Sequence, residues 1–316
     1  MKGVLLDFKA DHDRRADLFR LAMPGREIVA LWDTERDPTT MSDVAYAVVW
    51  KPEPGMLCRL PALEVVFSLG AGVDHVLADP ALPDVPLVRF VDPDLTGRMT
   101  AWVALQCLMH LRRQPEHAAA QEAREWSDLP TPAAGEVTVG VMGLGELGQD
   151  AVRALGALGF PVRGWSRTGK EIEGVDTFDA SGLDAFLAGT DILVALLPLT
   201  DDTRGILDAR LIDRLRPDGA LGGPVLVNAG RGGSQNERDI AAALRDGRLR
   251  GASLDVFERE PLPADSPLWD APNCILTPHD AAVSAPEAVA AYVAGQVARW
   301  EKREALENVV DRARGY

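Results

Sequence analysis

The stretch VTVGVMGLGELG (residues 137–148) decides the fold of the second half of this 316-residue chain. It begins as a strand-forming run, and Gly143, Gly145 and Gly148 then follow at the spacing G-x-G-x-x-G. The next segment, Gln149–Leu158, has helical composition and apolar spacing. A lone glycine pattern is weak evidence, but a strand, a glycine turn and a helix in this order are typical of the dinucleotide-binding fold.

In that fold the glycines have separate tasks. The first permits a tight turn, the second lets the backbone approach the pyrophosphate, and the third lets the helix pack closely with its N-terminus toward the phosphates. We therefore predict a cofactor-binding turn made of Gly143, Gly145, Glu146, Leu147 and Gly148.

The next expected strand, Val162–Trp165, indicates which dinucleotide binds. An NAD site usually places a carboxylate about 20 residues after the glycines, on the ribose 2′-hydroxyl. Here the strand is followed by Ser166, Arg167 and Thr168, and no carboxylate appears before Glu171. A serine removes the repulsion against a 2′-phosphate, and the arginine can pair with that phosphate. The pattern favours NADP, with NAD as the weaker cofactor, over the alternative of a solvated basic turn.

The composition excludes several classes of protein. The hydrophobic share of 47% and the charged share of 26% are those of an ordinary globular protein. The net charge of −15 argues against nucleic acid as a partner, and no apolar run approaches the ~18 residues of a membrane helix. Three scattered cysteines, expected as buried inert thiols, show no metal-ligand or disulfide spacing: Cys58, Cys107 and Cys274. We expect a cytoplasmic protein without a metal, a membrane partner or a nucleic-acid partner.

Short apolar β-rich runs alternate with helical stretches, a pattern that gives parallel sheets. The expected strands are Gly3–Phe8, Ala45–Trp50, Val65–Leu69, Leu87–Arg89, Val137–Met142, Val162–Trp165, Ile192–Leu196, Val225–Asn228, Ala252–Asp255 and Cys274–Thr277. Longer helical patterns cover Asp11–Leu21, Thr96–Arg113 and Pro286–Lys302. We predict two doubly wound α/β domains: residues 1–97 and 284–316 form a flavodoxin-like substrate domain, and a Rossmann domain, 98–283, is inserted into it.

Three candidate catalytic residues each follow an expected strand. Arg231 follows Val225–Asn228, Glu260 follows Ala252–Asp255, and His279 comes shortly after Thr277. Ligands of open α/β sheets bind at the carboxyl ends of the strands. There an imidazole can exchange a proton near neutral pH, a guanidinium can bind a carboxylate in a forked geometry, and a carboxylate can orient the imidazole. Taken singly, Arg231 and Glu260 are more often surface charges, and His279 is as often structural.

Taken together, these segments resemble the D-isomer-specific 2-hydroxyacid dehydrogenase family. The motifs that carry the resemblance run nearly the whole chain: SLGAGVD (68–74), the glycine turn, LPLTDDT (197–203), NAGRG (228–232), DVFEREPL (255–262), TPH (277–279) and VDRARGY (310–316). The segment WSRT (165–168) and the C-terminal tail are most similar to the glyoxylate/hydroxypyruvate reductase A branch, which prefers NADPH. The resemblance implies NADPH-dependent reduction of a small 2-oxo acid such as glyoxylate or hydroxypyruvate.

The resemblance also implies a role for individual residues. His279 would be the acid/base, Glu260 its partner and Arg231 the substrate anchor. The implied substrate contacts come from Trp50, with Lys51 beside it, and from Gly70, Ala71 and Gly72. Core packing is an equal alternative for Trp50. The implied cofactor contacts come from Pro198, Asn228, Ala229 and Asp255, and Asp255 would bind the nicotinamide carboxamide. The helical arm through Trp126 resembles a dimerisation arm, so we expect a homodimer.

The chain departs from the family pattern at two places. Asp280 follows the histidine where a small apolar residue is usual, and Gln235 and Asn236 replace the usual residues after the Arg-Gly turn. These departures leave the preferred oxo acid open. Two other functions also remain open: an NAD-dependent dehydrogenase of a bulkier 2-oxo acid, and a non-catalytic, dinucleotide-sensing protein similar to transcriptional corepressors.

Overall fold

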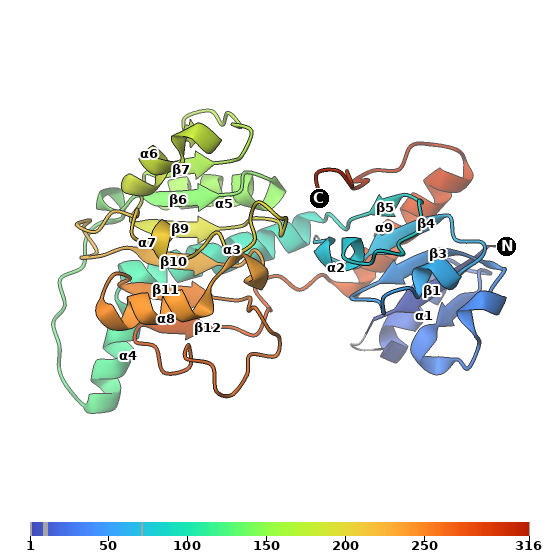
Figure 1. Cartoon of the computed structure of the whole chain (residues 1–316), viewed down its shortest axis with the longest axis horizontal. Helices are drawn as coiled ribbons and strands as arrows, with labels where there is room; N and C mark the ends of the chain where they lie inside the picture. The colour runs from blue at the N-terminus through green and yellow to red at the C-terminus, as the bar shows by residue number, and fades with distance from the viewer. Residues whose placement is uncertain (1, 9–11, 71, 316) are drawn as a thin grey trace. The chain divides into compact units, whose positions relative to one another are not determined.

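Figure 1 shows a computed structural model of the chain, which describes residues 2–8, 12–70 and 72–315. The chain divides into two compact units. Unit 1 comprises Met1–Leu95 and Ser284–Tyr316, and unit 2 comprises Thr96–Val283. Each unit contains one parallel sheet, so the predicted fold class of two parallel-sheet α/β domains is confirmed. The functional assignment of the two units stays a prediction at this point.

Unit 1 has the strand order β2-β1-β3-β4-β5. This is the flavodoxin-like order of a doubly wound sheet. Its elements are β1 (Gly3–Asp7), α1 (His12–Ala22), β2 (Ile28–Ala30), β3 (Val44–Val49), β4 (Val65–Ser68), α2 (Asp74–Leu77), β5 (Leu87–Val88) and α9 (Pro286–Glu301).

The last helix of the chain packs in unit 1. In α9 the apolar residues Val289, Val293 and Val297 recur every four residues and are buried, because a helix places such positions on one face. This helix packs against α1. At its end Glu301 accepts two hydrogen bonds of 2.9 Å from the Nη2 of Arg26, which joins the C-terminal helix to the first crossover of the sheet.

Unit 2 has the strand order β12-β11-β10-β9-β6-β7-β8, and Figure 1 shows the labelled strands stacked in this sequence. Counted from β6, the order is that of a Rossmann sheet, with the order reversing between β6 and β9. Its elements are α3 (Pro93–Leu111, which begins in unit 1), α4 (Gln114–Ala123), β6 (Val139–Met142), α5 (Glu146–Ala157), β7 (Val162–Trp165), β8 (Asp176–Phe178), α6 (Leu183–Ala188), β9 (Ile192–Ala195), α7 (Ala209–Ile212), β10 (Val225–Asn228), α8 (Glu237–Asp246), β11 (Gly251–Leu254) and β12 (Cys274–Leu276).

The central strands of this sheet are buried on both faces because helices cover both. In β9, Ile192 and Val194 pack with α3 and α5, whereas Leu193 and Ala195 pack with α6, α7 and α8. Neighbouring strands repeat this alternation, since successive strand residues point to opposite faces. Because the strands are parallel, the carboxyl ends of the central strands lie at one edge of the sheet, and the loops that follow them come together there.

Several local expectations need correction. The edge strands β2 and β8 have three residues each and are not among the expected strands; β8, with the sequence DTF, has a single apolar residue. Helix α5 begins at Glu146, earlier than the predicted Gln149. Cys58 is exposed, contrary to the expectation that all three thiols are buried. Among the described residues, no helix is both long and apolar enough to cross a membrane.

Candidate active site

The glycine turn joins β6 to α5. Gly143 has a φ of 108°, where a side chain would be strained, and a Cβ on it would lie 2.6 Å from the carbonyl oxygen of Leu196. A Cβ on Gly148 would lie 1.8 Å from the carbonyl oxygen of Gly143. At Gly145, by contrast, no described atom beyond the neighbouring residues of the chain lies within 4 Å of the position of a Cβ. The turn is thus closely packed on its inner side and open at its second glycine.

The N-terminus of α5 fits a diphosphate group. An α-helix leaves its first N–H groups unpaired, and this twelve-residue helix begins after Gly145 without a side-chain cap. Glu146 is exposed and Leu147 packs against the core formed by α3 and β6. Open N–H groups beside an open glycine form the anion-binding arrangement of dinucleotide folds. These residues therefore suit the pyrophosphate of a nicotinamide dinucleotide.

The strand next to β6 is β7, and it is followed by Ser166, Arg167 and Thr168. The Oγ of Ser166 is buried and has no hydrogen-bond partner among the described residues. Arg167 and Thr168 are exposed. Nη1 of Arg167 donates to Oδ2 of Asp202 at 2.8 Å. A hydroxyl and a guanidinium suit a phosphate, but the guanidinium already binds the Asp202 carboxylate, a partner that no sequence motif indicates.

The loop after β9, residues 197–203, presents both Pro198 and Asp202. Oγ1 of Thr203 donates to the carbonyl oxygen of Pro198 at 2.6 Å, and the N–H of Thr200 donates to Oγ1 of Thr203 at 2.8 Å. Local side-chain bonds of this kind fix a turn without regular secondary structure. The position of Asp202 is therefore set by a hydrogen-bonded turn.

The turn that carries Arg231 is held by two buried amides. Oδ1 of Asn228 accepts the N–H of Gly230 at 3.0 Å, and Nδ2 of Asn228 donates to Oε1 of Gln235 at 2.8 Å. Nε2 of Gln235 donates to the carbonyl oxygen of Val256 at 2.8 Å. Gln235, one of the departures from the family pattern, thus joins the loop after β10 to the loop after β11. Ala229, which follows Asn228, is 5% exposed. Its contact with a cofactor stays a prediction.

A second link joins the same two loops. The N–H of Glu237 donates to Oε1 of Glu258 at 2.8 Å, and the N–H of Glu258 donates to Oε1 of Glu237 at 2.7 Å. Burial raises the pKa of the Glu237 carboxyl, and the charge of Glu258 raises it further. Hydrogen bonds from the backbone of Glu258 and the side chain of Gln235 lower this pKa. The sequence gives no signal for this pair, since glutamates at such positions are usually solvated.

Asp255 holds the segment that carries His279. Its buried carboxylate accepts the hydroxyl of Thr277 at 2.5 Å, the N–H of Asp280 at 3.0 Å and the N–H of Ala281 at 3.1 Å. His279 has a φ of 56°, a conformation that strains a residue with a Cβ by about 1 kcal/mol. The bonds to Asp255 offset this strain. The predicted contact of Asp255 with a nicotinamide carboxamide stays a prediction.

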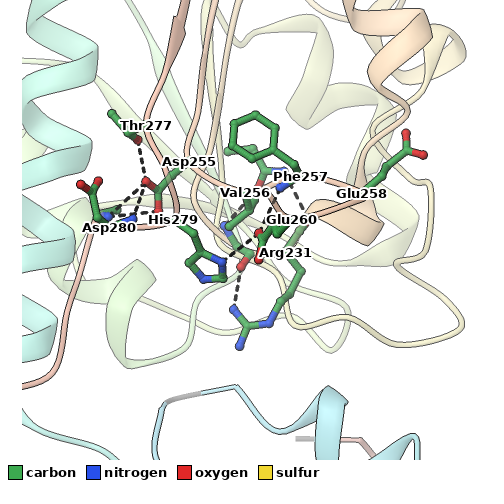
Figure 2. A network of polar contacts seen from close by, with 12 residues as sticks. Arg231, Asp255, Val256, Phe257, Glu258, Glu260, Thr277, His279 and Asp280 are labelled. Carbon is green, nitrogen blue, oxygen red and sulfur yellow. Dashed lines mark hydrogen bonds and ion pairs between the residues drawn. The ribbon is translucent and has the colours of Figure 1, made fainter. Parts of the chain in front are cut away.

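Figure 2 shows His279, Glu260 and Arg231 around one region of unit 2. Nδ1 of His279 lies 2.8 Å from Oε1 of Glu260, and their side chains are 31% and 22% exposed. The same oxygen accepts the N–H of Phe257 at 3.3 Å. Nη1 of Arg231 donates to the carbonyl oxygen of Gly230 at 2.7 Å, which bends the side chain back over its own turn.

This arrangement has a definite chemical capacity. An imidazole whose Nδ1 is held by a carboxylate can donate or accept a proton at Nε2. A guanidinium nearby can bind an anion. The Asp280 carboxylate is directed away from the imidazole in Figure 2. Among the described residues there is no cluster of His, Cys, Asp and Glu that could hold a metal ion.

The predicted substrate-binding residues Trp50, Gly70 and Gly72 belong to unit 1 and follow β3 and β4. A Cβ on Gly70 would lie 2.7 Å from Cζ3 of Trp50, so the indole packs directly on this glycine. The indole also contacts the ring of His75 at 4.5 Å between centroids. Ala71 lies outside the described residues. Packing accounts for Trp50, and its contact with a substrate stays a prediction.

The fold and the glycine turn define a protein of the dinucleotide-binding, doubly wound class. Residues 104–281 match the family model "D-isomer specific 2-hydroxyacid dehydrogenase, NAD binding domain". The glyoxylate/hydroxypyruvate reductase A of Citrobacter koseri is 41% identical over 302 residues, which cover 93% of each chain. The chain belongs to the D-isomer specific 2-hydroxyacid dehydrogenase family, as the sequence motifs predict.

Two solved structures are similar over the full length. A probable 2-hydroxyacid dehydrogenase from Rhizobium etli, in complex with NADP, HEPES and L(+)-tartaric acid, is 55% identical with a TM-score of 0.93 and covers 100% of this chain and 99% of its own. The NADPH-dependent glyoxylate/hydroxypyruvate reductase of Sinorhizobium meliloti, in complex with NADP and sulfate, is 54% identical with a TM-score of 0.94 and covers 100% of both chains.

Proposed function

We propose that this chain is an NADPH-dependent reductase of small 2-oxo acids, which converts glyoxylate to glycolate and hydroxypyruvate to D-glycerate. The observation that carries the proposal is the 2.8 Å contact between Nδ1 of His279 and Oε1 of Glu260 in the unit that also contains the glycine turn. The names of the relatives from Citrobacter koseri and Sinorhizobium meliloti support the substrates.

NADP is the proposed cofactor, with NAD as the weaker one. The open turn at Gly145 and the N-terminus of α5 suit the pyrophosphate. Ser166 and Arg167 supply donors for the 2′-phosphate. Two similar structures contain NADP. Pro198, Thr168 and the strand-end residues Asn228, Ala229 and Asp255 complete the proposed set of cofactor-binding residues.

The residues of this chain divide the work of the reduction. When bound, the reduced nicotinamide supplies the hydride that reduces the oxo carbon. Glu260 holds Nδ1 of His279, so Nε2 is the nitrogen that donates a proton to the oxo oxygen. Arg231 binds the carboxylate that every 2-oxo acid carries. After proton donation, Glu260 keeps the remaining proton on Nδ1 and thereby fixes the tautomer.

The decisive experiment follows the loss of NADPH absorbance with glyoxylate and with hydroxypyruvate. We expect turnover with both acids, slower turnover with NADH, and little turnover with an oxo acid that has a bulky aromatic group. His279→Ala should lower kcat about a hundred- to ten-thousand-fold, because it removes the proton donor, while NADPH still binds.

Two results would sink the assignment. If the wild-type chain binds NADPH but turns over no oxo acid, the protein is a dinucleotide sensor. If His279→Ala turns over at the wild-type rate, the proton comes from another group. A preference for NADH and for bulky oxo acids would replace the proposed substrate class with that of an NAD-dependent dehydrogenase.

We also propose a cytoplasmic homodimer. Trp126 is fully exposed and lies between α4 and β6, in a segment that resembles a dimerisation arm. Tryptophan is among the residues that are enriched at protein interfaces. All three cysteines are free, which suits a reducing compartment. Light scattering should give twice the chain mass, and Trp126→Ala should shift the protein toward monomer; cell fractionation tests the compartment.

A further inference from the structure

The ion pair between Arg167 and Asp202 conflicts with the task proposed for the arginine. Nη1 of Arg167 and Oδ2 of Asp202 are 2.8 Å apart, and a 2′-phosphate with a charge between about −1.5 and −2 would bind the same guanidinium. A phosphate and a carboxylate at one guanidinium repel each other. The carboxylate therefore has to yield part of its contact when the phosphate binds.

The pair is also weak enough to be displaced. The side chains of Arg167 and Asp202 are 46% and 68% exposed, and exposed ion pairs are readily exchanged for other partners. Asp202 is nonetheless held near Arg167, because Thr200 and Thr203 fix the turn that carries it. The turn thus keeps the carboxylate within reach of Arg167 even when the ion pair opens.

We propose that Asp202 is a specificity-determining residue that competes with the 2′-phosphate of the cofactor for Arg167. This inference rests on the proposed use of NADP. Asp202 weakens the binding of a 2′-phosphorylated nucleotide and does not affect the binding of a nucleotide with a 2′-hydroxyl. It therefore reduces the difference in affinity between NADP and NAD. The 2′-phosphate still wins, because its charge is larger and the buried hydroxyl of Ser166 is available to it.

Nucleotide binding tests this competition without any turnover. Isothermal titration with 2′,5′-ADP and with 5′-AMP compares two ligands that differ only in the 2′-phosphate. For Asp202→Asn, which keeps the size of the side chain, we expect 2′,5′-ADP to bind about two- to five-fold more tightly, the range of an exposed ion pair. The affinity for 5′-AMP should not change. The gain should shrink in high salt.

The neighbouring Asp201 provides a matched control. It is exposed on the same turn, and Asp201→Asn removes the same charge without changing the ion pair between Arg167 and Asp202. If the two variants gain affinity equally, only net charge matters and the proposal is wrong. It is also wrong if Asp202→Asn binds 2′,5′-ADP no better than the wild type. In the Arg167→Ala background the effect of Asp202→Asn should fall to that of Asp201→Asn.

The same titrations separate this inference from the proposed function. A wild-type protein that binds 2′,5′-ADP no better than 5′-AMP contradicts the NADP preference. The difference between Asp202→Asn and the wild type decides the role of Asp202 independently, because it compares one ligand across two variants.

Discussion

Oε1 of Glu260 lies 2.8 Å from Nδ1 of His279 and also accepts the backbone N–H of Phe257. The carboxylate is thereby attached to its own loop as well as to the imidazole. Because the histidine segment is separately fixed by Asp255, the relative position of the two side chains is set by the protein before any ligand binds.

Replacement of Glu260 by Gln tests the contribution of this carboxylate. The amide has nearly the same shape but no charge, so it forms a weaker hydrogen bond to Nδ1 of His279 than the carboxylate does. We expect kcat for glyoxylate reduction to fall about ten- to a hundred-fold, less than for loss of the proton donor itself. Steady-state kinetics with glyoxylate measures the loss. A variant with the wild-type kcat would contradict a role for the carboxylate in the reduction.

Arg167→Ala should separate the two cofactors. The guanidinium is proposed to pair with a phosphate that only NADP carries, and a charge-assisted contact of this kind is worth about 1.5–3 kcal/mol. We expect the KM for NADPH to rise about ten- to a hundred-fold and the KM for NADH to change little. Steady-state kinetics with both cofactors measures this, and equal changes would refute the phosphate contact.

The second and third glycines of the turn should respond differently to one added methyl group. A Cβ on Gly145 meets open space, whereas a Cβ on Gly148 would lie 1.8 Å from a backbone oxygen. We expect Gly145→Ala to fold with the wild-type Tm but to bind NADPH at least about ten-fold more weakly, because the methyl group occupies the side proposed for the pyrophosphate.

Gly148→Ala should instead lower the Tm, since α5 must move away from the turn. Overpacking of this kind costs about 1–3 kcal/mol or more. Thermal unfolding and NADPH titration of both variants distinguish the two effects. A Gly145→Ala protein with unchanged affinity for NADPH would show that the open side of the turn is not where the cofactor approaches.

Much of the fold and part of the candidate site could be predicted from the sequence, for identifiable reasons. Most strands of the two sheets are short apolar runs bounded by turn residues, and the glycine turn stands between a strand-forming run and a helical run, the context that makes its spacing informative. Arg231, Glu260 and His279 could be proposed because each follows a strand, and parallel strands end at one edge of a sheet. The geometry brings Glu260 and His279 into contact.

Other features were beyond the sequence because they depend on contacts between distant segments. Asp202 is 35 residues from Arg167, and nothing in either motif indicates that the side chains pair. The role of Gln235 depends on the position of the Val256 carbonyl oxygen, which only the folded loops define. The edge strand β8 has partly exposed residues, so its apolar pattern is too weak to distinguish it from a loop.

Gln235→Leu tests whether the two loops must be joined. The leucine leaves Nδ2 of Asn228 and the carbonyl oxygen of Val256 without this partner in a buried place, at about 1–3 kcal/mol for each group. Because Asn228 holds the turn of Arg231, we expect the KM for the oxo acid to rise about ten-fold, more than the KM for NADPH.

The neighbouring Asn236 serves as the control for stability alone. Its side chain caps α8 by accepting the N–H of Asp239 at 3.1 Å, and loss of such a cap costs about 1 kcal/mol. Asn236→Ala should therefore lower the Tm without the selective rise in KM. Similar kinetics for the two variants would mean that Gln235 acts only through stability.

His110 should make the fold sensitive to acid. It is buried in α3, and its Nε2 lies 2.9 Å from Oγ of Ser253, which donates in turn to Oε1 of Gln106. Burial lowers the pKa of His110 from an ordinary value near 6.5 to about 4; nearby Arg250 lowers it too, and Glu116 opposes them. The folded protein therefore resists a proton that the unfolded chain accepts.

The direction in which pH changes the free energy of unfolding follows from proton linkage. Between pH 6.5 and about 4 the unfolded state binds the extra proton, so the free energy of unfolding falls as the pH is lowered through this window. At 1.36 kcal/mol per pH unit, a difference of 6.5 − 4 corresponds to about 3 kcal/mol. His110→Gln cannot titrate, so its free energy of unfolding should decline less steeply from pH 7 to pH 4.5 in urea titrations. Parallel curves for the variant and the wild type would show that other groups determine the acid sensitivity.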